Sequence, residues 1–97
     1  DRTAVRFGQF DSAGTLHAGN IGINMPRQSV GFYRTTGSGD WQTCTFTVSV
    51  NSDNASTARY AIVTRGAFPT WTYVYIYTAA GALVDAAFSL VETCPES

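Results

Sequence analysis

A segment of strictly alternating side chains, residues 41–50, constrains the fold of this chain more than any other feature. From residue 43 onward, apolar side chains occupy the even positions and hydroxyl side chains occupy the odd positions. The apolar set is Cys44, Phe46, Val48 and Val50, and the hydroxyl set is Thr43, Thr45, Thr47 and Ser49. A period of two predicts a strand of an antiparallel sheet that has one buried and one solvated face.

Composition extends this prediction to the whole chain of 97 residues, which holds thirteen Thr, eight Val, five Tyr and six Phe but three Leu, two Glu and no Lys. Strand-forming residues are therefore abundant, and the usual helix formers are scarce. Turn residues separate extended segments at the spacing that is typical of a sandwich or barrel. We expect one domain, residues 1–97, folded as an antiparallel, jelly-roll-like β-sandwich of about seven or eight strands. The expected strands cover residues 4–10, 15–25, 28–35, 41–50, 59–65, 70–78 and 83–94.

The alternation also predicts which side chains face the core. In the first segment Val5 and Phe7 are expected to point inward and Arg6 outward. The segment 15–25 contains two glycines and precedes a proline, so we expect a bulge or an edge strand there.

The two cysteines, Cys44 and Cys94, lie 50 residues apart, which fits neither a CxxC redox pair nor a four-ligand zinc set. The alternatives are one disulfide or two buried thiols. Both residues are in phase with the apolar side chains of their own segments, so both thiols would point into one interior, and we expect a disulfide. Closing a loop of this length removes about 4 kcal/mol of unfolded-state entropy in the chain-entropy model. A disulfide favours an oxidising location, so we expect a secreted, periplasmic or cell-surface protein.

The charge pattern limits the function. A net charge of −1 with 13% charged residues argues against nucleic-acid binding, which needs a basic surface. No apolar run approaches the ~20 residues of a membrane-spanning helix. A Ser–His–Asp set could be drawn from Ser12, His17 and Asp85, but no local motif supports it. We expect no catalytic residues, no metal and no cofactor.

The segment 70–78 carries the most informative pattern, because Trp71, Tyr73, Tyr75 and Tyr77 recur at every second position. Residues at that spacing lie on one face of a strand. Three interpretations are open: a subunit interface, packing within one subunit, and a flat platform for a ligand such as a glycan. Two more aromatic residues, Tyr33 and Trp41, fall on the outward phase of their own segments and could extend the patch.

Asn54-Ala55-Ser56 is a glycosylation sequon, which matters only in a host that glycosylates asparagine. The chain begins at Asp1 without a signal peptide, and we expect it to be processed or cut from a longer protein.

Three stretches together resemble the small C-terminal β domains of bacterial collagen-like surface proteins and phage-tail-fibre-like proteins. They are the opening segment 5–16, the Gly31-Phe32-Tyr33 sequence that leads to Cys44, and the segment 78–94. The resemblance implies a trimeric cap or an adhesive head on a fibre, without enzyme activity. The chain departs from the group in its Tyr-Val-Tyr-Ile-Tyr segment, which is richer in aromatic residues.

We therefore expect a non-catalytic extracellular assembly or adhesion module that forms a homo-oligomer, with a trimer favoured. One alternative is a carbohydrate-binding module that uses the aromatic segment to bind a glycan or cell-surface receptor. A second alternative is a small secreted inhibitor or toxin.

Overall fold

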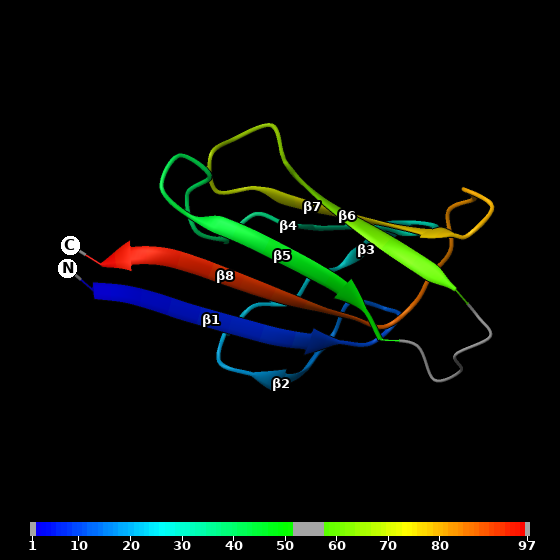
Figure 1. Cartoon of the computed structure of the whole chain (residues 1–97), viewed down its shortest axis with the longest axis horizontal. Helices are drawn as coiled ribbons and strands as arrows, with labels where there is room; N and C mark the ends of the chain where they lie inside the picture. Colours follow the sequence, from blue (N-terminus) through cyan, green and yellow to red (C-terminus); the bar gives the residue numbers. More distant parts are fainter. Residues whose placement is uncertain (1, 52–57, 97) are drawn as a thin grey trace.

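The computed structural model describes residues 2–51 and 58–96, and within these residues all regular structure is β. Two antiparallel sheets pack face to face in a molecule with principal extents of 43 × 25 × 20 Å (Figure 1). The strands are β1 (Arg2–Phe10), β2 (Leu16–Gly19), β3 (Arg27–Ser29), β4 (Phe32–Thr35), β5 (Thr45–Val50), β6 (Arg59–Arg65), β7 (Thr72–Thr78) and β8 (Phe88–Glu96). The predicted all-β sandwich is confirmed. The described residues contain no helix that is long and apolar enough to cross a membrane.

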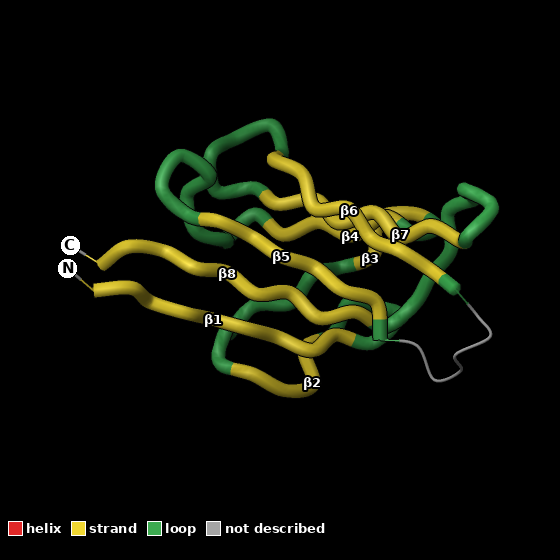
Figure 2. Tube along the Cα trace, in the orientation of Figure 1, coloured by secondary structure: helices red, strands yellow, loops and turns green. Residues whose placement is uncertain are grey.

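The strand order explains how the chain ends come together. Sheet A has the order β2-β1-β8-β5, and sheet B has the order β3-β4-β7-β6. The first strand therefore pairs with the last, β4 pairs with β7, and the chain crosses between the sheets several times (Figure 2). This nested antiparallel winding is jelly-roll-like. Both termini lie at the same end of the molecule (Figure 1).

The core fills the space between the two sheets. Phe88 lies at its centre, where its ring packs 5.1 Å from Phe10 on sheet A and 4.8 Å from Tyr33 on sheet B, between ring centroids. The buried apolar cluster is Phe10, Ile21, Met25, Tyr33, Val74, Ile76, Ala86, Phe88 and Leu90. Both sheets and the segment between β2 and β3 thus contribute to one core.

The alternation predicted for residues 41–50 is present in β5. Phe46, Val48 and Val50 pack against the core, whereas the hydroxyl residues between them are exposed. The strand is shorter than predicted, because residues 41–43 form a turn. The predicted disulfide joins Cys44, just before β5, to Cys94 on β8.

The predicted orientation of β1 is wrong. Phe7 is 47% exposed and Val5 is also exposed, while Arg6 lies on the face that meets the core. Antiparallel pairing with β8 places Arg6 opposite Glu92, and paired residues project from the same face. Because Glu92 is buried, Arg6 points to the interior side of the sheet.

Other predicted strands are shorter, divided or shifted, and the segment 83–94 forms a strand only from Phe88 onward, in β8. Only Leu16–Gly19 of the segment 15–25 forms a strand, and it is an edge strand whose pairing has a bulge at Gln9/Phe10, as expected from its glycines. The segment 28–35 contains a hairpin instead of one strand. Its turn needs Gly31, whose φ of 68° lies in the left-handed region and whose added Cβ would meet backbone atoms of Ile76 and Val84.

Candidate functional site

The outer face of sheet B carries a continuous aromatic surface. We define the aromatic face as Phe32, Tyr60, Ile62, Tyr73, Tyr75 and Tyr77. Register explains why they meet: Phe32 on β4 and Ile62 on β6 flank Tyr75 of β7, and Tyr60 lies opposite Tyr77. The strand β7 shows the predicted alternation, because Thr72, Val74 and Ile76 are buried and the tyrosines between them are partly exposed.

The rings of the aromatic face stack on one another across the strands. Phe32 and Tyr75 have ring centroids 4.8 Å apart and an interplanar angle of 6°, and Tyr60 and Tyr77 are stacked at 5.2 Å and 20°. Rings lying flat and side by side on the sheet could not approach this closely, so the ring faces overlap. Tyr75 and Tyr77 each have a further neighbour on the side away from the stacked ring. Ile62 is paired with Tyr75 across the strands, and Leu83 forms an isolated β-bridge with Tyr77. The rings of Tyr75 and Tyr77 are therefore each covered on one face by a stacked neighbour, whereas Tyr73 meets Phe32 edge to face at 5.2 Å and 84°.

Trp71 lies at one end of the aromatic face. The Arg34 guanidinium is 5.2 Å from the centroid of its ring, and Phe68 contacts it edge to face at 4.8 Å. A cation over an indole face is a favourable contact. Both partners restrict the free surface of this indole.

The prediction that Tyr33 extends the aromatic patch is wrong, because its side chain is fully buried. Pairing of β4 with β7 puts Phe32 on the outer face, so the adjacent Tyr33 must point inward. Its hydroxyl donates to the carbonyl of Ser12 at 2.6 Å, and burial raises the pKa of the Tyr33 phenol.

Trp41 also lies away from the aromatic face. It precedes β5, and its ring packs 4.2 Å from Phe46, whose side chain faces the core. Its indole N–H donates to the Trp71 carbonyl at 2.9 Å. Trp41 thus closes one end of the sandwich.

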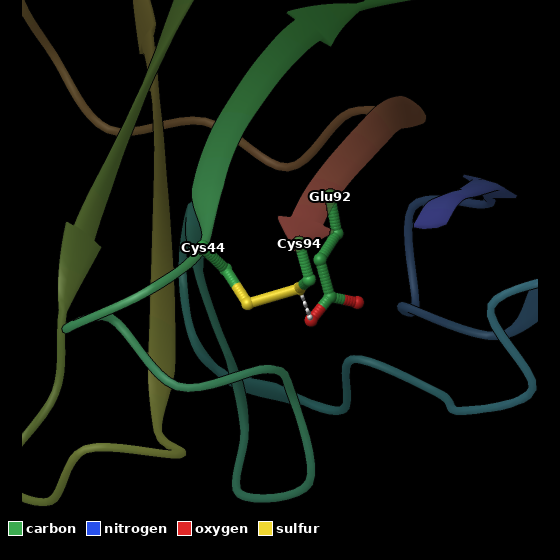
Figure 3. A group of neighbouring side chains, drawn as sticks. All are labelled: Cys44, Glu92 and Cys94. Atoms are coloured by element: carbon green, nitrogen blue, oxygen red, sulfur yellow. Dashed lines mark hydrogen bonds between the residues drawn. A yellow bond between two sulfur atoms is a disulfide. The ribbon is translucent and has the colours of Figure 1, made fainter. Parts of the chain in front are cut away.

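The carboxylate of Glu92 lies beside the Cys44–Cys94 disulfide at that end (Figure 3). Glu92 is 1% exposed, and its Oε1 accepts a hydrogen bond from the backbone N–H of Gly39. Its Oε2 lies 3.5 Å from Nε of Arg6. Arg6 and Gly39 come from segments that are distant from Glu92 in the sequence, so no local sequence pattern pairs them.

Cys44, Glu92 and Cys94 form the only group of potential metal ligands found among the described residues. The two sulfur atoms are joined to each other, so neither is available as a thiolate ligand. The Cys94 sulfur lies 3.7 Å from Oε1 of Glu92. Because a disulfide sulfur carries no hydrogen, this is a van der Waals contact.

The ionisable residues at the opposite end form two separate pairs. His17 Nε2 lies 2.9 Å from Oδ2 of Asp11, and this hydrogen bond is the main cause that lowers the pKa of Asp11. Arg27 Nε donates to Oδ2 of Asp85 at 2.7 Å. The structure therefore does not pair His17 with Asp85.

Comparisons with protein-family models, with curated proteins and with solved structures gave no match for this chain. The class that the structure defines is a disulfide-linked antiparallel β-sandwich with an aromatic outer face. The glycosylation sequon at Asn54 lies outside the described residues.

Proposed function

We propose that this protein is a non-catalytic extracellular assembly or adhesion module that forms a homo-oligomer through the aromatic face. The observation that carries this proposal is the clustering of six large side chains on the outer surface of sheet B. Tyr60 and Ile62 are 47% and 44% exposed, and the three tyrosines of β7 are partly exposed beside them. Contiguous exposed apolar surface of this kind marks interaction sites in soluble proteins.

The chemistry of the face favours a second copy of the chain as its partner. None of its six residues is charged, and the one cation beside it, Arg34, is held over the Trp71 indole at its end, so the centres of two identical faces can meet without like-charge repulsion. Tyrosine is enriched at protein interfaces because its ring buries a large area while its hydroxyl can find a polar partner.

Ring orientation disfavours the alternative of a flat glycan platform on β7. A sugar stacks on an open ring face, but Tyr75 has Phe32 on one side and Ile62 on the other. Side chains that present edges and hydroxyl groups are better suited to interlock with another protein surface than to hold a pyranose.

The extracellular location is proposed from the Cys44–Cys94 disulfide, which is compatible with an oxidising compartment. A trimer is the state that we favour, on the resemblance of the sequence to trimeric caps of fibres. The same oligomer would place several copies of any adhesive surface on one particle, which raises avidity.

Sedimentation equilibrium at micromolar concentrations tests the proposal. We expect Ile62→Arg to weaken self-association at least tenfold, because it adds a charge at an exposed position of edge strand β6. The matched control is Val91→Arg, at an exposed position on the outer face of sheet A. A monomer at all concentrations, or equal association of both variants, would contradict the proposal.

A further inference from the structure

A surface pocket lies at the end of the sandwich where Trp41 packs, away from the centre of the aromatic face. Its volume is about 180 Å³. Trp41 and Gln42 from the loop before β5 form one wall, and the segment 65–69 after β6 forms the other. This volume is below the 300–1,000 Å³ that is typical of pockets for drug-sized ligands, so it suits a single small ring.

Backbone hydrogen bonds hold the two walls together. The N–H of Trp41 donates to the carbonyl of Pro69 at 3.0 Å, and the N–H of Ser38 donates to that of Thr70 at 3.0 Å. Within the second wall, the N–H of Gly66 donates to the carbonyl of Trp71 at 2.9 Å. The walls are therefore positioned before any ligand arrives, which lowers the entropic cost of binding.

The apolar part of the pocket is built from Trp41, Phe68 and Pro69. Phe68 is 58% exposed, so much of its ring remains open although it also contacts Trp71. An exposed phenylalanine beside a proline and an indole offers an apolar surface for the C–H face of a ring.

The polar part consists of Arg65 and Gln42, which are both exposed. Within the described part of the chain, neither side chain makes an ion pair or a side-chain hydrogen bond. The acidic residue of the same loop, Asp40, uses Oδ1 to accept the backbone N–H of Gln42 at 2.7 Å. The guanidinium and the carboxamide thus remain available for the oxygens of a ligand.

We propose that this pocket binds one pyranose residue of a glycan and that Arg65 gives a preference for a pyranose that carries a carboxylate. A pyranose combines an apolar C–H face for Phe68 with hydroxyl groups for Gln42. A carboxylate accepts two parallel hydrogen bonds from a guanidinium, which a neutral sugar cannot match. None of the pocket residues belongs to the aromatic face, although Gly66 adjoins Tyr73 and Phe68 contacts Trp71, so the pocket and the self-association are tested separately.

Ligand titration followed by NMR tests this proposal, with the two indole N–H signals as reporters. The probes are glucuronate, galacturonate and N-acetylneuraminate, with glucose and galactose as neutral sugars and acetate as a bare carboxylate. We expect at least one acidic sugar to bind with a millimolar or lower Kd, to shift the Trp41 indole signal, and to bind at least fivefold more tightly than any neutral sugar. Repeating the titration on Ile62→Arg separates failure of this site from failure of the oligomer.

Two variants locate the site. Arg65→Gln should reduce the affinity for the acidic sugar to the level of the neutral sugars, and Phe68→Ser should remove binding of both. Arg34→Gln is the matched control, because Arg34 also lies beside an indole but outside the pocket. No response to any sugar, or acetate binding as tightly as the acidic sugars, would overturn the proposal. Equal binding of acidic and neutral sugars would overturn the role of Arg65.

Discussion

Arg6 Nε lies 3.5 Å from Oε2 of Glu92, and this ion pair joins a partly exposed guanidinium to a carboxylate that is 1% exposed. The other carboxylate oxygen accepts the Gly39 N–H, whereas Oε2 has no hydrogen-bond partner among the described residues. Arg6 is therefore the main compensation for the charge at Oε2, and it connects β1 to the disulfide-bearing end of β8.

Replacing Arg6 by Met should lower the free energy of unfolding by about 1–2 kcal/mol. Breaking a fully buried pair costs about 3–5 kcal/mol, and the partial exposure of Arg6 reduces this loss. Urea unfolding of the four proteins of a double-mutant cycle with Glu92→Gln measures the effect. The loss should be much smaller when Glu92→Gln is already present, and an equal loss in both backgrounds would contradict the ion pair.

Gly39 should not tolerate even one methyl group. A Cβ at this position would overlap Oε1 of Glu92 and lie 2.7 Å from each sulfur of the disulfide. We expect Gly39→Ala to lower the free energy of unfolding by about 1–3 kcal/mol, the usual cost of overpacking. The control is Gly37→Ala, whose Cβ would have its nearest neighbour at 3.9 Å. Chemical denaturation measures the free energy of unfolding of both variants. Equal values would contradict the close contact of Gly39 with Glu92 and the disulfide.

Asp85 should make the stability depend on pH in the acidic range. Burial alone raises its pKa, but hydrogen bonds from the Gly31 N–H and from Arg27 outweigh burial and lower the pKa below its ordinary value. A carboxyl whose folded-state pKa is lowered stabilises the protein above its unfolded-state pKa of about 4, and this contribution is lost as the pH falls through the folded-state value.

Asp85→Asn should therefore cost about 1 kcal/mol at neutral pH and almost nothing below the folded-state pKa. Thermal unfolding as a function of pH measures this difference. Part of the acid sensitivity should persist in the variant, because the pKa of Asp11 is also lowered, first by its hydrogen bond to His17. A constant cost across the acidic range would show that charge at Asp85 is not responsible.

The disulfide should supply a large share of the stability. It joins residues separated by 50 positions, and opening such a loop costs about 4 kcal/mol in the chain-entropy model. Unfolding in the presence and absence of a thiol reductant should differ by about 2–5 kcal/mol. Titration of thiols in denatured, non-reduced protein should find none, and two reactive thiols would contradict the bond.

The alternation of side chains was sufficient to predict the buried face of a strand where only one of the two alternating sets of side chains is apolar. In β5 the hydroxyl residues could not fill the core, so the other set of side chains had to face it. The inward phase of both cysteines likewise follows from their own segments, so the disulfide was predictable.

The alternation of side chains did not predict the buried face where both alternating sets contain large apolar residues. In β1, Phe7 and Phe10 lie on opposite faces, and in β4 Phe32 and Tyr33 are adjacent. In β1 and in β4, either face of the strand could therefore have been the buried one. The aromatic face was only partly predicted for a related reason, since Phe32, Tyr60 and Ile62 join β7 through cross-strand pairing.

The sequence by itself determined the class of this protein: a period of two, strand-forming side chains and two in-phase cysteines permit a linked sandwich and little else. The tertiary structure decided which face of β1 and β4 is buried, and it brought Arg6, Gly39 and Glu92 together. The physical reason is that the two-residue alternation of side chains is a property of each short segment, whereas the face that a strand buries depends on its register with a strand many residues away.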